Sequence, residues 1–152
     1  MSKLLPVPFR RQLTRGYCLP ACAEMILAYL GFNISQKQIA QMMGASEEGV
    51  PFSRVNAIES LGVRVRLSKE GDWDVLQDAF RQEQPSLVAV DLVFFPYAQV
   101  DESHVVVVVG INDDEVSVLD PFEDPGLRHI KKDAFIAAWT ELDCAYAVIT
   151  KA

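Results

Sequence analysis

The sequence predicts an α+β domain with an antiparallel sheet. Two observations lead to this fold class. Helical patterns fill the first part of the chain, whereas short β-branched runs that follow one another closely dominate the remainder. Strands adjacent in sequence and joined by short turns pair antiparallel, and helices grouped before them form a separate layer on the sheet.

Three helices are expected in the first half. The segment 19–30 has apolar residues at mixed helical spacings, which indicates a helix buried on most sides. The next helix opens at Ser35 with a capping-box pattern and ends at Gly44. A third, about 53–61, ends before Gly62.

The second half is expected to be mainly strands. The residues 112–114 (Asn-Asp-Asp) tolerate turn geometry and separate two β-branched runs, so they mark the clearest hairpin. The expected strands are 63–67, 86–93, 104–111, 115–119 and 145–150, and the expected helices between them are 73–81 and 132–139.

Length and composition favour one globular domain over residues 1–152. The chain is 50% apolar and 23% charged, which is ordinary for a folded protein. A chain of this size buries about 69% of its unfolded surface, so a core can form without disulfides. The three cysteines are an odd number, which excludes a closed disulfide framework.

Charge and hydropathy exclude several classes of partner. The formal net charge is −7, whereas binding to nucleic acid or anionic lipid requires clustered positive charge. No secretory signal opens the sequence, and no apolar run approaches the roughly 20 residues of a membrane span. We therefore expect a cytoplasmic protein with reduced thiols, without a nucleic-acid partner or an integral membrane segment.

Cys18 is the first candidate for chemistry. It stands at the start of the first expected helix, where unpaired amides and partial positive charge favour a thiolate. The alternative is that Cys18 is simply a small apolar residue buried in the core. Cys22 is expected in the core, and no metal site is expected, because Cys144 and the two histidines are scattered along the sequence.

His104 and Asp120 are expected to meet across the predicted hairpin. They lie symmetrically about Asn112, so Asp120 falls within about three residues of a cross-strand neighbour of His104. The carboxylate can then fix the imidazole tautomer and leave the other ring nitrogen for a nucleophile. The alternative is structural: the hydrogen bonds of His104 are satisfied at the end of a strand, and Asp120 only opens a turn. His129 is expected on the surface.

Together these residues match the requirements of a thiol hydrolase. A nucleophile, a base and an orienting carboxylate follow one another along the chain. An oxyanion also needs two donors, for which the Cys18 amide and the Gln12 side chain are candidates. The aromatic segment 92–97 just before the histidine can line a groove or pack between the two halves of the molecule.

Two runs carry a resemblance to a known family. Gln12 followed by GYCLPACAEMILAYLG at 16–31 resembles the nucleophile helix of the papain-like, bacteriocin-processing cysteine peptidases (family thirty-nine, which cleave after double-glycine leaders) and their stand-alone relatives. The run SHVVVVVGINDDEVSVLDPF at 103–122 resembles the histidine-to-aspartate hairpin of the same family. The resemblance extends over nearly the whole chain.

The resemblance implies a papain-like fold, with a helical lobe at about 12–62 and a sheet lobe at about 63–152. It implies Cys18 as nucleophile, His104 as general base and then acid, Asp120 as orienter and Gln12 as oxyanion donor. It implies no cofactor and no metal, and a peptide or protein as substrate.

One position departs from the family pattern. Relatives commonly have glycine after the nucleophile, whereas this chain has Leu19, whose bulk is expected to narrow the groove beyond the thiol. Whether the groove accepts double-glycine substrates therefore stays an open question. The predicted function is hydrolysis of a peptide or isopeptide bond, and the alternatives are a catalytically inactive peptide-binding domain and acyl or amide transfer through the same thioester.

Overall fold

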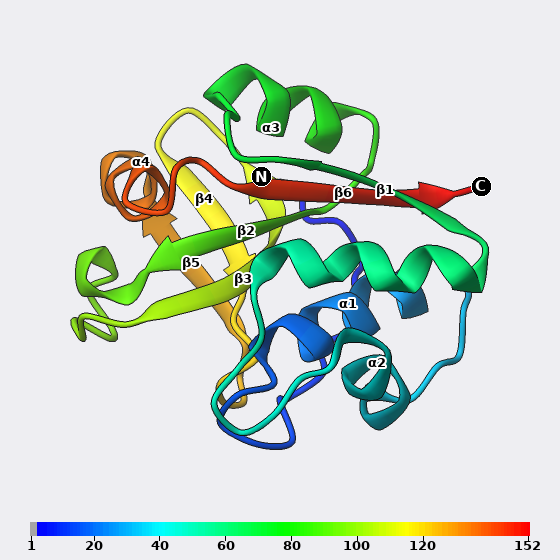
Figure 1. The fold of residues 1–152 in the computed structure, drawn as a ribbon. Helices are drawn as coiled ribbons and strands as arrows, with labels where there is room; N and C mark the ends of the chain where they lie inside the picture. The colour runs from blue at the N-terminus through cyan, green and yellow to red at the C-terminus, as the bar shows by residue number, and fades with distance from the viewer. Residues whose placement is uncertain (1–2) are drawn as a thin grey trace.

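A six-stranded antiparallel sheet forms the centre of the molecule, with helices on both of its faces (Figure 1). The computed structural model describes residues 3–152. The strand order is β1-β6-β2-β3-β4-β5, and the α+β class predicted from the sequence is confirmed. In chain order the elements are α1 (Cys18–Tyr29), α2 (Gln36–Met43), the 3-10 helix η1 (Phe52–Leu61), β1 (Val63–Ser68), α3 (Trp73–Arg81), β2 (Ser86–Asp91), the 3-10 turn η2 (Leu92–Phe94), β3 (Ser103–Ile111), β4 (Glu115–Leu119), β5 (Leu127–Lys131), α4 (Lys132–Thr140) and β6 (Tyr146–Lys151).

Strand β3 is buried on both faces. Its odd-numbered valines (Val105, Val107 and Val109) join the core formed with α1, α2 and η1. Its even-numbered valines (Val106 and Val108) join a second core with α3 and α4. Side chains of a strand alternate between faces, so an uninterrupted run of valines suits a strand covered on both sides.

The first helices form largely as predicted. Helix α2 has a complete capping box at Ser35 and ends at Gly44, which adopts a left-handed conformation with φ of 73°. The segment 52–61 is a 3-10 helix with only Val55 and Ile58 buried, and it ends at Gly62. The prediction of a helix there was correct, and the sequence pattern did not distinguish its type.

Two features of the sheet differ from the prediction. Strand β2 ends at Asp91 instead of residue 93, because the Asp91 carboxylate accepts a hydrogen bond from the Val93 amide at 3.0 Å and starts η2. Strand β5 was not predicted. Only Ile130 of its five residues is buried, and an edge strand of this kind leaves little hydrophobic pattern in the sequence.

Within residues 3–152, no helix combines the length and the apolar character that crossing a lipid bilayer would require.

Candidate active site

Cys18 is the first residue of α1 and is half-buried. The first amides of a helix have no partner within it and carry partial positive charge. The chain reaches this point through Gly16, where a Cβ atom would lie 2.0 Å from the Ser46 carbonyl oxygen. Only glycine allows the loop 46–49 to pack this closely against the backbone just before the thiol.

Helix α1 packs on β3 and thereby brings Cys18 to the start of that strand. The Cys22 thiol, one turn further along, donates a hydrogen bond to the Val105 carbonyl at 3.4 Å. Cys22 is fully buried in the core, as predicted. Burial, followed by the negative charges of Cys18 and Asp120, raises the pKa of Cys22 well above its ordinary value, so this thiol stays neutral.

His104 and Asp120 form a buried pair. The imidazole Nε2 lies 2.7 Å from Asp120 Oδ1, and the two residues are 7% and 3% exposed. The hairpin register places Val107 opposite Leu119. Asp120 therefore lies just beyond the last paired residues and close to His104. This agrees with the prediction that Asp120 lies within about three residues of a cross-strand neighbour of His104.

The other side of the imidazole meets Cys18. His104 has a side-chain hydrogen bond with Cys18. Because Nε2 faces Asp120, Nδ1 is the ring nitrogen left for the sulfur. The structure thus brings together three sequence-predicted residues from the start of α1, the start of β3 and the end of β4.

The electrostatics of the pair favour the charged forms. Burial lowers the pKa of His104, but the hydrogen bonds with Asp120 and Cys18 and their negative charges outweigh burial and raise that pKa to about 10. Burial raises the pKa of Asp120, but its hydrogen bond to His104, the imidazolium charge, and the Tyr97 hydroxyl and Phe122 amide outweigh it and hold that pKa below the ordinary value. An imidazolium between two acceptors is what a thiolate nucleophile requires.

Gln12 lies near His104 and Asp120, but it does not line the cavity that contains Cys18. It lines the same cavity as His104 and Asp120, and its backbone amide donates to the Pro121 carbonyl at 2.8 Å. Its side-chain Nε2 donates to the Thr14 and Arg15 carbonyls, each at 3.0 Å. Both amide hydrogens are therefore engaged within the chain in this structure, while Oε1 is buried without a hydrogen-bond partner.

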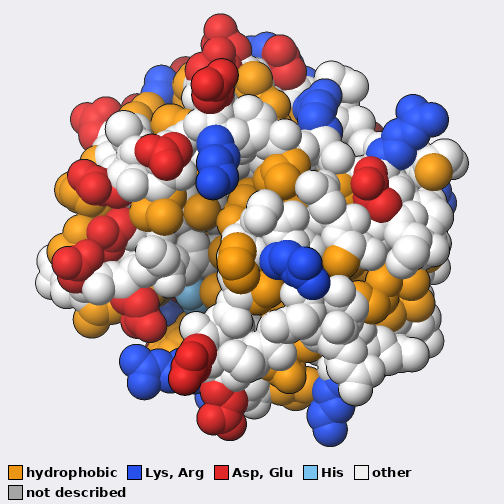
Figure 2. All heavy atoms as spheres, viewed as in Figure 1, with side chains coloured by type: hydrophobic (Ala, Val, Ile, Leu, Met, Phe, Trp, Pro, Cys, Tyr) orange, Lys and Arg blue, Asp and Glu red, His pale blue; other side chains and the backbone are white. Residues whose placement is uncertain are grey.

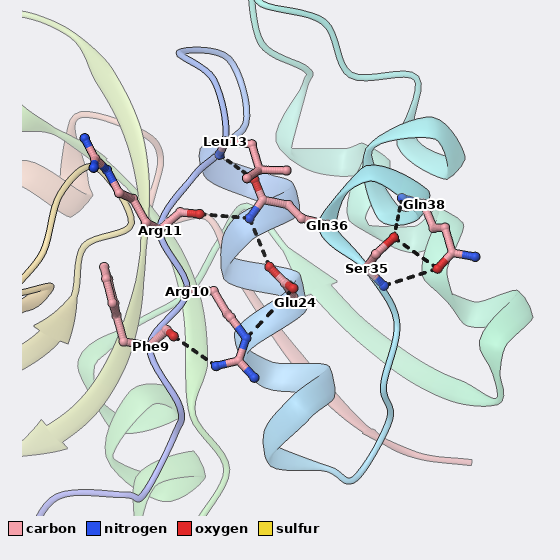
Figure 3. Close-up of polar contacts among 8 residues, drawn as sticks. All are labelled: Phe9, Arg10, Arg11, Leu13, Glu24, Ser35, Gln36 and Gln38. Carbon is pink, nitrogen blue, oxygen red and sulfur yellow. Dashed lines mark hydrogen bonds and ion pairs between the residues drawn. The ribbon is translucent and has the colours of Figure 1, made fainter.

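Gln36, in the first turn of α2, fixes the segment that carries Gln12 (Figure 3). Its Oε1 accepts from the Leu13 amide at 2.8 Å, and its Nε2 donates to the Arg11 carbonyl at 3.0 Å and to Glu24 Oε1 at 2.9 Å. The residues on both sides of Gln12 are thus tied to one buried amide. Nothing in the sequence indicates this role, because Gln36 stands within a capping box and no local pattern shows that it is buried.

Two cavities flank the imidazole. One, of about 610 Å³, has Gln12, Tyr97 and Phe122 in its wall. The other, of about 540 Å³, contains Cys18 and the segment 47–52. His104, Arg15 and Glu102 belong to both. On the face drawn in Figure 2 a histidine ring lies at the bottom of a hollow whose rim carries acidic and basic side chains.

The expectation that Leu19 narrows the groove is wrong. Leu19 is 1% exposed, belongs to the core under α1 and lines neither cavity. The side chain of the second residue of the helix points away from the thiol, so its size does not reach the groove.

The aromatic segment fills one of the two roles that the sequence left open, because Tyr97 lines a cavity but Phe95 packs within the sheet lobe and not between the two halves. Phe95 is fully buried in the core that contains α3 and α4, whereas Tyr97 is 37% exposed and lines the larger cavity. His129 is exposed on β5, as predicted, where its Nδ1 lies 2.8 Å from the Ser117 hydroxyl. In the described residues, no three His, Cys, Asp or Glu side chains gather closely enough to hold a metal ion.

Similar proteins place this chain in a family. The model of the Peptidase C39-like family matches residues 4–147. An uncharacterized protein of Methanothermobacter marburgensis is 27% identical over 131 residues, covering 86% of this chain and 81% of that protein.

Solved structures share the fold. A Bacillus anthracis protein described as a C39-like peptidase aligns with a TM-score of 0.84 at 18% identity, covering 100% of this chain and 98% of that one. The peptidase domain of Streptococcus ComA, a bifunctional ABC transporter involved in quorum sensing, gives 0.74 at 19% identity, covering 94% and 97%. A double-glycine-motif protease from an AMS/PCAT transporter, solved with its leader peptide, gives 0.71 at 18% identity, covering 100% and 99%. The resemblance read from the two sequence runs is thereby confirmed, and the chain belongs to the Peptidase C39-like family.

Proposed function

We propose that the protein is a cysteine peptidase that hydrolyses a peptide bond with Cys18, His104 and Asp120. The observation that carries this proposal is the continuous set of contacts from the half-buried thiol through the imidazole to the buried carboxylate, with a cavity on each side of the ring. Membership of the family supports a peptidase kind of chemistry.

The reaction follows from these positions. The Cys18 thiolate attacks the carbonyl carbon, and the charge that develops on oxygen is held by the Cys18 amide and by Gln12, one of whose amide hydrogens turns from the chain to the oxyanion. His104 gives its proton to the leaving amine as the tetrahedral intermediate collapses to a thioester. His104 then takes a proton from water, the hydroxide forms the acid, and the thiolate is released.

The substrate is proposed to be a peptide that crosses the imidazole from one cavity to the other. A related fold has been solved with a bound leader peptide, which supports an extended peptide in this groove. Because Leu19 lies in the core, it does not block small residues next to the thiol. Leader processing is therefore part of the proposal, whereas no observation favours a binding-only domain or transfer to a second amine. The cytoplasmic compartment stays a prediction.

A peptide-digestion experiment tests the proposal. The wild-type protein is incubated with a complex peptide library and, separately, with a panel of peptidyl vinyl sulfones, and the products are mapped by mass spectrometry. We expect new peptide termini and covalent labelling at Cys18, both lost in Cys18→Ala.

Cys144→Ala is the matched control, because Cys144 is also half-buried but its thiol donates a hydrogen bond to the Thr140 hydroxyl, at 3.9 Å, and its side chain packs against the core with α3 and α4. It should retain full cleavage and labelling. Cleavage that persists in Cys18→Ala, or vinyl sulfone labelling of Cys144 in preference to Cys18, would contradict the proposed function.

A further inference from the structure

The second oxygen of the Asp120 carboxylate is held by a residue outside the triad. Oδ1 lies 2.7 Å from His104 Nε2 and accepts the Phe122 amide at 2.9 Å. Oδ2 accepts a short hydrogen bond from the Tyr97 hydroxyl. The two oxygens thus have separate partners, and the hydroxyl opposes rotation of the carboxylate about its bond to the rest of the side chain.

The Tyr97 ring is itself held from two sides. The ring of Phe95, fully buried in the core, lies 5.9 Å away between centroids. The Arg128 guanidinium lies over the ring, 4.4 Å from its centroid, and pairs with Glu123 at 3.9 Å. A ring packed between an anchored phenylalanine and a cation has few alternative positions, so its hydroxyl is presented in a fixed direction.

The hydroxyl remains a donor at every working pH. Burial, followed by the charge of Asp120 and the hydrogen bond to it, raises the pKa of Tyr97, and the opposing influence of Arg128 is smaller. The proton therefore stays on Tyr97 while the carboxylate stays charged.

We propose that Tyr97 is a positioning residue of the triad, which holds the Asp120 carboxylate so that Oδ1 faces His104 and the imidazole keeps its proton beside the Cys18 thiolate. The inference rests on the proposed function. The sequence pattern placed this tyrosine in an aromatic segment that can line a groove, but it did not indicate the contact with Asp120, which arises only through the fold.

Several charged groups surround the imidazole, and the test must separate their effect on Cys18 from the effect of the Tyr97 hydroxyl. Asp120 contacts it from the end of β4 and Cys18 from α1. Arg15 and Glu102 line both cavities beside it and face each other at 4.0 Å. Arg11, Glu123 and Arg128 line the larger cavity alone, and Glu47 and Glu48 line the smaller one alone. Tyr97→Phe leaves all of these charged groups in place and removes only the hydroxyl.

The experiment measures alkylation of Cys18 by iodoacetamide from pH 4 to pH 10, followed residue by residue by mass spectrometry. A hydrogen bond to a charged group is worth about 1.5–3 kcal/mol, and 1.4 kcal/mol corresponds to tenfold. We expect Tyr97→Phe to slow alkylation about tenfold at pH 6, with the rates converging at pH 10, where an ordinary thiol is largely ionised.

Tyr29→Phe is the matched control. Its hydroxyl also donates a hydrogen bond, to the Glu83 carbonyl at 2.7 Å, but it lines neither cavity. The control should follow the wild-type profile. Thermal unfolding of each variant checks its fold, and Arg128→Gln, which removes the cation over the Tyr97 ring, is a second variant that should slow alkylation at pH 6 in the same direction by a smaller factor.

The outcomes are distinct. If Tyr97→Phe or Arg128→Gln folds and its Cys18 is alkylated at the wild-type rate at pH 6, the inference about Tyr97 is overturned. The proposed function is not affected by that result. A faster rate in Tyr97→Phe also overturns it, because the hydroxyl would then only withdraw charge from Asp120. If wild-type Cys18 is alkylated no faster than Cys144 at pH 6, the proposed function itself fails.

Discussion

The surroundings of Cys18 and Cys144 differ although both thiols are half-buried. Cys18 begins a helix and has the imidazole of His104 beside it. Cys144 follows α4 in a turn, with φ of 54°, where its thiol donates to the Thr140 hydroxyl at 3.9 Å and its side chain packs against the core with α3 and α4. Exposure therefore does not distinguish the proposed nucleophile from the other half-buried thiol. The difference lies in a buried chain of donors and acceptors that extends behind the imidazole to Asp120 and Tyr97.

Cys22 adds a third environment on the same helix. It lies one turn after Cys18, yet it is fully buried and its thiol bonds to the Val105 carbonyl. A displacement of about 6 Å along the helix axis thus separates a thiol with a base from one without. The environment at the helix start is local, and removing one partner should make Cys18 behave like Cys144.

The largest expected effect comes from removing the imidazole. In His104→Gln, Cys18 has no cation to stabilise its thiolate, and an ordinary thiol is ionised to less than about 1% at pH 6. We expect alkylation of Cys18 by iodoacetamide at pH 6 to fall roughly a hundredfold and to approach the rate of Cys144 in the same sample.

The control for this variant is His129→Gln, which removes the exposed histidine of β5. It should leave both rates unchanged. A Cys18 rate that survives the loss of His104 would show that the helix start alone activates the thiol.

The next effect concerns stability and its dependence on pH. The pKa of His104 is raised to about 10 from an ordinary 6.5, so its contribution is present below pH 6.5 and is lost as pH rises toward 10. The pKa of Asp120 is lowered, so its contribution is present above about pH 4 and is lost on acidification. At any pH between 4 and 6.5, Asp120→Asn should have a free energy of unfolding about 3 kcal/mol lower than that of the wild type. This difference between the two proteins should shrink as the pH approaches 10.

Denaturant unfolding at pH 5.5, 7.5 and 9.5 measures this difference. Asp113→Asn, in the exposed turn of the hairpin, is the matched control and should show little change at any pH. A destabilisation by Asp120→Asn that is constant with pH would mean that the pair does not hold its charges as inferred.

The smallest expected effect concerns the segment that carries Gln12. Gln36→Leu releases the segment around Gln12, so turnover of a cleaved peptide should fall several-fold while alkylation of Cys18, which forms no oxyanion, stays unchanged. Combined with Gln12→Ala, the two losses should not add, because both act on one donor.

Gln38→Ala is the control for Gln36→Leu. Gln38 belongs to the capping box of the same helix but makes no contact with residues 11–13 among its hydrogen bonds. It should cost about 1 kcal/mol of stability and leave turnover unchanged. Equal losses of turnover in both variants would indicate a general effect of loosening α2.

The sequence predicted most of the secondary structure because its signals are local. The capping box at Ser35, the turn at 112–114 and the β-branched runs each act within a few residues, so they could be recognised without the fold. Strand β5 and the type of η1 were not recognised, because one or two buried residues give no clear period. The proposed triad was suggested by the order of Cys18, His104 and Asp120, which resembles that of a family.

Tertiary structure alone decided which polar groups support these residues. Tyr97 reaches Asp120 across 23 positions and Gln36 reaches Leu13 across the same number. Neither pairing follows from spacing, because it depends on how a loop and a helix pack against distant segments. The direction of Leu19 into the core was settled in the same way, by the packing of α1 on β3. The sequence by itself thus determined the helices, the hairpin and the candidate reacting groups, and packing determined their orientation, because hydrogen bonds in a buried site depend on positions in space that local patterns do not encode.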